Sequence, residues 1–161
     1  MGVRITHKVD YGVRVMTTIA ARQQDEPGRP VTRTVLAERN DVPPGFLFDI
    51  LRQLRNAQLV RSVRGGDGGW LLARPAEAIT VADVIRALDG PLASVRGVRP
   101  HELQTEGGHE PFISMWIAVR AALRSVLEHV TIGDLAKGRL PDEIAALAAQ
   151  PDAWDPHRPA R

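Results

Sequence analysis

The stretch that decides the fold is residues 31–74, VTRTVLAERNDVPPGFLFDILRQLRNAQLVRSVRGGDGGWLLAR. It contains two short helical patterns separated by a tight corner, followed by two strand-like runs joined by a glycine-rich tip. This order is typical of a helix-turn-helix followed by a β-wing, an architecture of DNA-binding domains. The stretch therefore predicts a mainly α fold with a small β-wing.

The two helical patterns have recognisable start and stop signals. Thr34 is a residue type that caps helix starts, so the first helix is expected from Thr34 to Asn40. Asn40-Asp41 tolerates the left-handed backbone of a tight corner, and Pro43-Pro44 suits the first turn of a second helix. The second helix has a predicted buried stripe at helical spacing, formed by Leu47, Ile50, Leu51 and Leu54.

The wing and its flanks follow the same kind of reasoning. Residues 59–64 alternate like a half-buried strand, the tip GGDGG at residues 65–69 suits a tight hairpin, and residues 70–73 are expected to return as the partner strand. Upstream, residues 4–22 predict a helix capped by Thr6 and weakened by Gly12. Downstream, residues 80–88 predict a further capped helix.

The second half of the chain is organised by one long helix. Residues 90–110 are expected to form a loop, and a helix is expected from Pro111 to about Val130. Its apolar residues step by four and three, as in a coiled-coil seam, which predicts a dimer interface. The same spacing would also suit an ordinary wide core face. The predicted interface residues are Phe112, Trp116, Val119, Leu123, Val126 and Val130.

These elements divide the chain into four predicted parts. Residues 1–90 form a winged helix-turn-helix DNA-binding domain, and residues 91–110 form a connecting loop. Residues 111–138 contain the dimerisation helix and a short closing helix. Residues 139–161 contain a weak helix and a polar, proline-rich tail that is expected to be disordered.

Composition limits the class of protein. The absence of cysteine excludes disulfides, thiol chemistry and cysteine-ligated metal sites. No apolar run is long enough to span a membrane, and the N-terminus lacks the apolar core of a signal peptide, so a cytoplasmic protein is expected. Residues 1–74 hold 12 Arg and Lys against 7 Asp and Glu, whereas residues 75–161 hold 9 against 12. The basic first half suits contact with an anionic polymer.

The sequence does not indicate an enzyme. Its histidines are scattered, and they form no recognisable catalytic or zinc-binding motif. His101 and His109 lie near glutamates in the predicted loop, where solvated side chains or a metal or small-ligand site would both be compatible with the spacing. The GGDGG tip lacks the Lys-Ser/Thr of a nucleotide-binding loop and precedes a strand, so a tight hairpin explains its glycines better.

DNA binding is the interpretation that the pattern favours. The outer face of the second helix would enter a major groove, and Arg64 at the wing could enter a minor groove. Phe48 could instead make a peripheral core contact, Asp49 could accept from a cytosine or repel phosphate, and Arg52 and Arg55 could form a solvated face. The predicted DNA-binding residues are Lys8, Tyr11, Thr34, Gly45, Phe46, Phe48, Asp49, Arg52, Arg55, Arg64, Gly65 and Gly66.

Several segments together resemble the Rrf2-type bacterial transcription regulators. They are RITHKVDYGVRVM (4–16), LAERNDVPPGFLFDILRQLRNAQLVRSVRGGDGGWLLAR (36–74), ITVADVIRALDG (79–90) and the helix from Trp116 into TIGDL (131–135). The resemblance implies a winged helix-turn-helix dimer that binds an imperfect palindrome in promoter DNA, with the long helix at the dimer interface. It implies backbone contacts near Lys8 and Tyr11, major-groove contacts from Gly45 to Asp49, and a minor-groove contact from Arg64.

The chain departs from the family pattern in two places. Many members hold an iron–sulfur cluster through three cysteines before the long helix, but this loop has none, and aligning on Trp116 places Glu110 and Ile113 at two of the family's ligand positions. No cofactor is therefore expected. Family members also often have Glu-Gln where Phe48-Asp49 stand, so their operator sequences need not apply here.

The sequence thus predicts a sequence-specific DNA-binding transcription regulator, acting as a homodimeric repressor on a palindromic promoter site without an iron–sulfur cluster. A small-molecule or protein effector could act at residues 90–110. The alternative hypothesis is a winged-helix module that regulates a metabolic enzyme by protein contact, because an exposed Phe48 would suit a protein surface.

Overall fold

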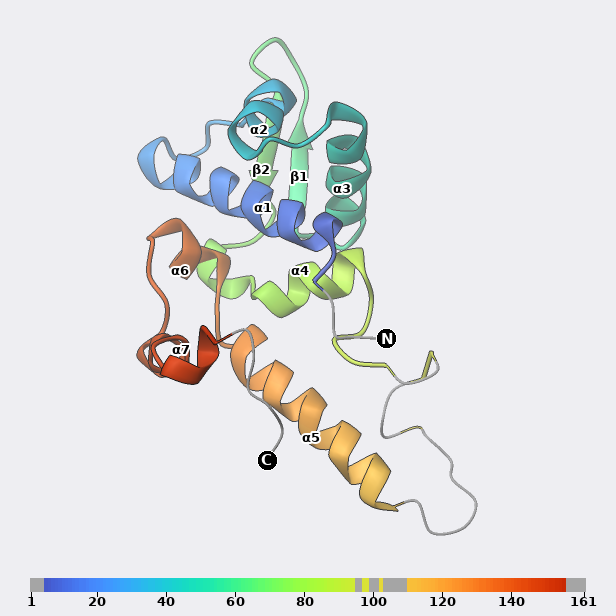
Figure 1. Ribbon diagram of the computed structural model, residues 1–161. Helices are drawn as coiled ribbons and strands as arrows, with labels where there is room; N and C mark the ends of the chain where they lie inside the picture. Colours follow the sequence, from blue (N-terminus) through green and yellow to red (C-terminus); the bar gives the residue numbers. More distant parts are fainter. Residues whose placement is uncertain (1–4, 95–96, 99–101, 103–109, 156–161) are drawn as a thin grey trace.

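The computed structural model describes residues 5–94, 97–98, 102 and 110–155. The fold is mainly α-helical with a two-stranded antiparallel wing, as predicted (Figure 1). In chain order its elements are α1 (His7–Asp25), α2 (Arg33–Asn40), α3 (Pro44–Asn56), β1 (Val60–Val63), β2 (Gly69–Leu72), the short 3-10 helix η1 (Ala76–Ala78), α4 (Val81–Leu88), α5 (Glu110–Leu127), α6 (Ile132–Ala136), α7 (Asp142–Ala148) and the 3-10 helix η3 (Pro151–Ala153).

Threonine side chains cap the starts of α1, α2, α4 and α6, with one correction to the predictions. The Thr6 hydroxyl accepts a hydrogen bond from the backbone N–H of Val9 (3.2 Å), as expected. The start of α2, however, is capped by Thr32, whose hydroxyl accepts from the N–H of Val35 (3.4 Å). Thr32 has the extended backbone that a cap requires, whereas Thr34 already lies inside the first helical turn. The prediction that Thr34 is the cap is therefore wrong.

The corner between α2 and α3 forms as the sequence predicts. Asp41 has a left-handed backbone (φ 51°, ψ 47°) and its N–H donates to the Ala37 carbonyl. Asn40 is almost fully buried, and its amide is satisfied on both sides, donating to the Leu36 carbonyl (2.9 Å) and accepting from the Thr18 hydroxyl (3.1 Å). Pro44 then opens α3 in the position where its missing N–H costs nothing.

The wing is anchored to the strand-like residue that precedes α2. β1 and β2 pair in the register Val60↔Leu72 to Val63↔Gly69, and Val31 adds a further antiparallel bridge to Trp70. A Cβ atom on Gly69 would lie 2.5 Å from the Val31 carbonyl oxygen, so only glycine allows this approach. β1 is shorter than the predicted strand 59–64, and β2 begins and ends one residue before the predicted strand 70–73, although Ala73 still donates to the Leu59 carbonyl (3.0 Å).

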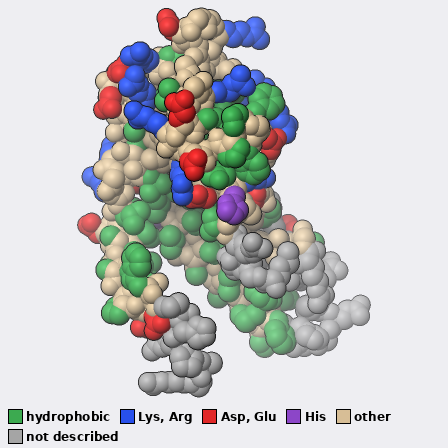
Figure 2. All heavy atoms as spheres, turned by 45° about the horizontal axis from the view of Figure 1, so that its top comes forward, with side chains coloured by type: hydrophobic (Ala, Val, Ile, Leu, Met, Phe, Trp, Pro, Cys, Tyr) green, Lys and Arg blue, Asp and Glu red, His purple; other side chains and the backbone are tan. Residues whose placement is uncertain are grey.

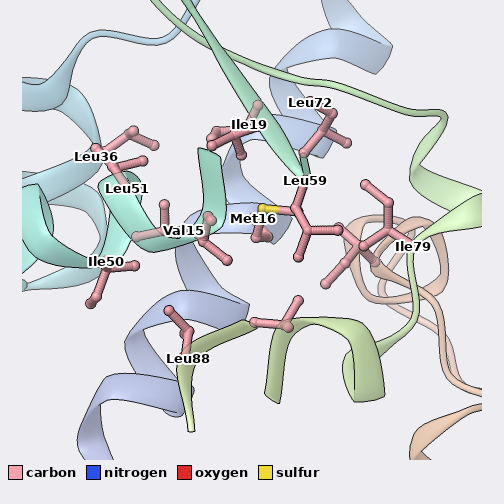
Figure 3. Close-up of a cluster of buried hydrophobic side chains, with 14 of the residues drawn as sticks. Val15, Met16, Ile19, Leu36, Ile50, Leu51, Leu59, Leu72, Ile79 and Leu88 are labelled. Atoms are coloured by element: carbon pink, nitrogen blue, oxygen red, sulfur yellow. The ribbon is translucent and has the colours of Figure 1, made fainter. Parts of the chain in front are cut away.

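The core lies between α1, the wing and helices α2 to α4. Met16 and Ile19 of α1 are fully buried among side chains of α2, α3 and β1, together with Ile79 and Leu88 (Figure 3). Gly12, which the sequence identifies only as a weak point of α1, has a packing reason. Its missing Cβ would lie 2.3 Å from Leu88 Cδ1, so glycine lets α1 approach α4 closely.

The C-terminal half first extends away from this core with α5 and then returns to it with α6. Ile132 of α6 is fully buried in the cluster that α1 contributes to, so the predicted division at residue 90 does not divide the core. By contrast, α5 extends away from the rest of the molecule (Figure 1). It ends at Leu127, three residues before the predicted end.

The segment predicted to be a disordered tail is partly folded. Residues 151–153 form η3, and the Trp154 indole donates to the Ala148 carbonyl (2.6 Å), so that expectation is wrong for these residues. Ile144 of α7 is buried, which attaches this helix to the molecule. Residues 156–161 lie outside the described residues. Among the described helices, none combines the length and apolarity needed to cross a bilayer.

Candidate nucleic-acid interface

Three of the predicted DNA-contacting segments meet at one end of the molecule. The wing tip, α2 and the first turn of α3 lie at the end away from α5 (Figure 1). Lys and Arg side chains gather over this end, interspersed with acidic ones, and a hydrophobic patch lies beside them (Figure 2). The fold therefore brings together helix and hairpin surfaces that the sequence separates by about twenty residues.

The outer side of α3 is exposed where the sequence places base contacts. Pro44 to Phe46 are exposed, and Phe46 and Phe48 expose 44% and 56% of their surface. The interpretation of Phe48 as a core contact is therefore wrong. We call Gly45, Phe48, Asp49 and Arg52 the reading face of α3, opposite the stripe buried in the core.

Asp49 is held by two neighbours on its own helix. Arg52 donates to Asp49 Oδ1 (2.5 Å), and the Gln53 side-chain amide donates to Asp49 Oδ2. The hydrogen bond from Arg52 lowers the pKa of Asp49 below its usual range, with further lowering by Gln53 and by the charge of Lys8. Asp49 is therefore an anion already paired with a cation of the same face.

The start of α1 supports α3 from the side. Tyr11 is half-buried and meets Phe46 edge-on, with ring centroids 5.9 Å apart and planes at 79°. Lys8 forms an ion pair with Asp89 (3.2 Å), and the Thr6 hydroxyl donates to the same carboxylate. Lys8 and Tyr11, both predicted to approach the DNA backbone, thus also fix α1 against α3 and the end of α4.

An open groove of about 460 Å³ runs between the start of α2 and the wing. Arg33 and Thr34 line one side, and Arg64 and Gly65 line the other. The free backbone N–H groups of a helix start and its partial positive charge favour anions there. Arg33 was missed by the sequence reasoning, because the cap was placed two residues too late; with Thr32 as the cap, Arg33 is the first helical residue.

The glycines of the wing tip fall into two groups. Gly65 has a positive φ of 119°, and a Cβ on Gly68 would collide with the Val63 carbonyl oxygen at 2.5 Å, so the hairpin itself requires both. Gly66 has neither restriction. Arg64 and Arg61 are exposed beside this tip. Like Arg33, Arg61 is a cation that is absent from the predicted DNA-binding residues. The alternation of the strand, which directs residue 61 outward, is the sequence signal that indicates it.

The predicted dimer seam is partly exposed. Phe112 and Trp116 expose 61% and 37% of their surface, and Met115 and Ile117 beside them expose 46% and 43%. Val119, Leu123 and Val126 are half-buried. Val130 differs, because it lies beyond the end of α5 and is buried within its own subunit. Val130 is therefore not available to a partner, and the predicted seam is limited to Phe112 through Val126.

Some predicted features lie outside the described residues. His101, His109 and most of the predicted effector loop belong to this group. Among the residues that the structure does describe, no group of three or more His, Cys, Asp or Glu side chains could hold a metal ion.

A helix-turn-helix followed by a wing, with cations around both, defines the class of winged-helix DNA-binding regulators. The model of the Rrf2 family, described as iron-dependent transcriptional regulators, matches residues 5–138. The chain belongs to the Rrf2 family of transcription regulators, which confirms the resemblance seen in the sequence.

Related proteins support the same assignment. An HTH-type transcriptional regulator described in Mycobacterium tuberculosis is 44% identical over 146 residues, covering 91% of this chain and 89% of that protein. The structure of CymR, the global cysteine regulator of Bacillus subtilis, matches with a TM-score of 0.71 and 31% identity, covering 85% of this chain and 98% of that one. The structure of T. potens IscR matches with a TM-score of 0.67 and 31% identity, covering 96% of this chain and 98% of that one. These relatives are transcription regulators, not enzymes.

The family description includes iron dependence, but this chain lacks the donor atoms of a cysteine-ligated cluster. Cysteine is absent from the whole sequence. Glu110 begins α5 and Ile113 lies within it, at the positions where the resemblance places two of the family's ligands. An isoleucine side chain has no donor atom for iron. A cysteine-ligated iron–sulfur cluster therefore does not fit this chain.

Proposed function

We propose that the protein is a homodimeric repressor that binds a palindromic promoter site. Each subunit inserts α3 into a major groove and places the wing against the neighbouring minor groove. The observation that carries the proposal is the convergence of the reading face of α3, the start of α2 and the wing tip at the end opposite α5. Two such units side by side would cover promoter DNA and block access to it.

The α2–wing groove supplies the contacts that position the duplex. Phosphate contacts fix the register of a protein on DNA, and exposed guanidinium groups and helix N-termini make them. Arg33 and Thr34 offer both features on one wall, and Arg64 lies on the other. Arg64 is also the cation that the narrow, negatively charged minor groove would attract.

The exposed half of α5 supports the dimer. Large apolar side chains at 37–61% exposure are costly in water, and their three-and-four spacing suits knobs-into-holes packing with a second copy. The proposed interface residues are Phe112, Trp116, Val119, Leu123 and Val126. A symmetric dimer presents two identical reading helices, so its site is palindromic with half-sites about 34 Å apart or a multiple of that.

Selection from a random DNA pool tests the proposal directly. The purified protein is expected to enrich one inverted repeat, and footprinting should show protection of two half-sites on the promoter that carries it. Transcription in vitro from that promoter should fall as protein is added. Enrichment of a single unrepeated half-site would contradict the dimer, and increased transcription would contradict the repressor.

A second candidate function has support from one observation. Phe46 and Phe48 expose apolar surface on α3, which would also suit a protein partner such as a metabolic enzyme. Salt dependence separates the two candidates, because DNA binding through phosphates weakens steeply as salt rises. A stoichiometric protein partner, together with sequence-indifferent and salt-insensitive DNA affinity, would favour the second candidate.

The start of the connecting segment is the proposed place for an effector. Arg86 and Arg120 line a hollow of about 350 Å³ with Gly90, Pro91 and Leu92. This hollow lies between α4 and α5, so a small anionic molecule or a protein segment bound there would change how α5 sits on the winged-helix unit. An effector should therefore change operator affinity, and charge removal at Arg120 should abolish that change.

A further inference from the structure

The two exposed phenylalanines of α3 differ in what holds them. Phe46 is engaged, because its ring meets Tyr11 of α1 edge-on. Phe48 has no aromatic partner within the described part of the chain and exposes 56% of its surface. An apolar ring this exposed on the helix that faces DNA has no packing reason within the subunit. It is placed to contact an apolar group on the partner of α3.

The two charged residues of the reading face, Asp49 and Arg52, differ in how many of their hydrogen-bonding groups are used within α3. Asp49 accepts from Arg52 with one carboxylate oxygen and from Gln53 with the other. Each oxygen thus already accepts one hydrogen bond from the same helix, and these bonds hold the carboxylate beside Arg52 and Gln53. Arg52 uses one terminal nitrogen on Asp49, and a guanidinium has several further N–H donors. The Arg52 side chain is half-exposed, so these donors can reach a base edge.

We propose that, within the promoter binding proposed above, α3 reads a thymine through Phe48 and a guanine through Arg52. Asp49 is the positioning residue that orients Arg52. Apolar side chains contact the thymine methyl group in the major groove, and arginine pairs with guanine through O6 and N7. The proposal rests on DNA binding and adds the content of the half-site.

Helix geometry predicts how far apart the contacted thymine and guanine lie in each half-site. Residues 48 and 52 lie one turn apart on the same side of α3, about 6 Å along its axis. Base pairs stack about 3.4 Å apart. The thymine and the guanine should therefore lie within about two base-pair steps of each other in each half-site. A Cβ on Gly45 would meet nothing within 4 Å, so the fold leaves room for the helix start to approach the duplex closely.

Base analogues in the selected site test the two contacts separately. Replacing the contacted thymine by uracil removes only the methyl group, which should weaken wild-type binding about fourfold per half-site. Replacing the contacted guanine by 7-deazaguanine removes the N7 acceptor and should weaken binding about 5- to 100-fold. Phe48→Ala should bind the thymine and uracil sites equally, and Phe48→Leu should restore part of the preference. Arg52→Ala should lose the guanine preference.

The positioning role of Asp49 has its own readout. Asp49→Asn should lower the ratio of affinities for guanine and 7-deazaguanine sites while leaving the thymine–uracil ratio unchanged. Arg55→Ala is the matched control, because Arg55 is exposed on the same helix but lies further from its start. It should weaken binding to all sites alike. Unchanged thermal unfolding of each variant would confirm that the fold is intact.

The outcomes distinguish this inference from the function on which it rests. Selection of a defined site that tolerates uracil and 7-deazaguanine at every position would overturn the base reading and leave the proposed function standing. Failure to select any site would overturn the proposed function itself. If Asp49→Asn kept the full guanine preference, the positioning role would be wrong. If Phe48→Ala abolished binding of a protein partner but left DNA binding unchanged, Phe48 would serve protein contact, and the proposal would also be overturned.

Discussion

Helices α3 and α5 follow the same kind of apolar spacing but have opposite surroundings. In α3 the stripe Leu47, Ile50, Leu51 and Leu54 has at most 1% of its surface exposed. In α5 the residues Phe112, Met115, Trp116 and Ile117 expose 37–61%. Periodicity therefore shows that a helix has a face to bury, but not which molecule buries it. The apolar stripe of α3 is buried by other segments of the same chain, whereas the first half of α5 extends away from the winged-helix unit.

The two helices also differ in what their other faces do. The buried stripe of α3 fixes the helix, so its opposite side can be held in a constant geometry for DNA. The C-terminal end of α5 is fixed to α4, where Glu128 accepts from both Arg86 and Arg124, while its start lies free of the core. Folding of the winged-helix unit and the proposed assembly into a dimer should therefore be separable by substitutions in α3 and in α5.

The largest expected effect comes from the buried side of α3. Leu51→Ala removes a side chain with no exposed surface and leaves a cavity between α3 and its neighbours. The free energy of unfolding should fall by about 2–5 kcal/mol. Urea unfolding at a fixed protein concentration measures it, because the proposed dimer would make stability depend on concentration.

Arg55→Ala is the control for this experiment, because it changes the exposed side of the same helix. Its effect on unfolding should stay within about 0.5 kcal/mol. A loss below about 1 kcal/mol for Leu51→Ala would mean that the site collapses around the smaller side chain or that α3 is less tightly held than its burial implies.

The next largest effect concerns α5. Trp116→Glu places a charge at the centre of the proposed seam in both copies, where a Trp hot spot is typically worth about 2 kcal/mol or more. Sedimentation should show a dimer for the wild type and a monomer for the variant at micromolar concentration. Ser114→Glu is the matched control, because residue 114 lies on the side of α5 away from the seam. A dimeric Trp116→Glu protein would mean that another surface forms the interface.

Most of the fold could be predicted because its signals are local. Proline pairs, threonine caps and 3.6-residue spacing act within a few residues, and they predicted the existence of α1 to α4, although not of the short helix η1. The errors arose where two local signals compete or where the third dimension decides. Thr32 and Thr34 are both good caps, and only the chain path after Val31, which pairs with Trp70, selects Thr32. The burial of Val130 likewise depends on α6 returning to the core.

The candidate site was less predictable, because it depends on side-chain partners from distant segments. The sequence identified Lys8, Asp49 and Arg52 as separate candidates. It could not show that Lys8 pairs with Asp89, which is 81 positions away, or that Arg52 and Gln53 engage both oxygens of Asp49. A side chain that is paired in this way positions its neighbours, and it need not contact DNA itself. Side-chain rotamers determine such pairing, and sequence spacing alone does not reveal them.

A smaller effect should come from the wing. Arg64→Ala removes an exposed cation on the wing side of the α2–wing groove and should weaken specific DNA binding by about 1–3 kcal/mol. Arg74→Ala is the control, because Arg74 lies at the base of the wing beyond β2, within 3.7 Å of Asp83. Mobility shifts on the selected site measure both. Equal affinity of Arg64→Ala and wild type would show that the wing does not contact DNA.

The smallest expected effect tests the attachment of α5 to α4. The hydrogen bond from Arg86, followed by that from Arg124, lowers the pKa of Glu128 below its ordinary value of 4.5. A carboxylate with a lowered pKa in the folded state stabilises the fold above its unfolded-state pKa, and this stabilisation is lost as the pH falls through the folded-state pKa. Because the groups are solvent-exposed, the effect is small and screened by salt.

Glu128→Gln should therefore lower the thermal unfolding midpoint slightly at pH 7 and low salt. The difference from wild type should shrink as the pH falls well below 4.5, where both side chains are uncharged, and also as salt is added at pH 7. Glu143→Gln, a change to an exposed side chain of α7, controls for loss of a negative charge. If the Glu128→Gln difference persisted in acid, the side chain would act by packing, and the ion pairs would not be what joins α5 to the winged-helix unit.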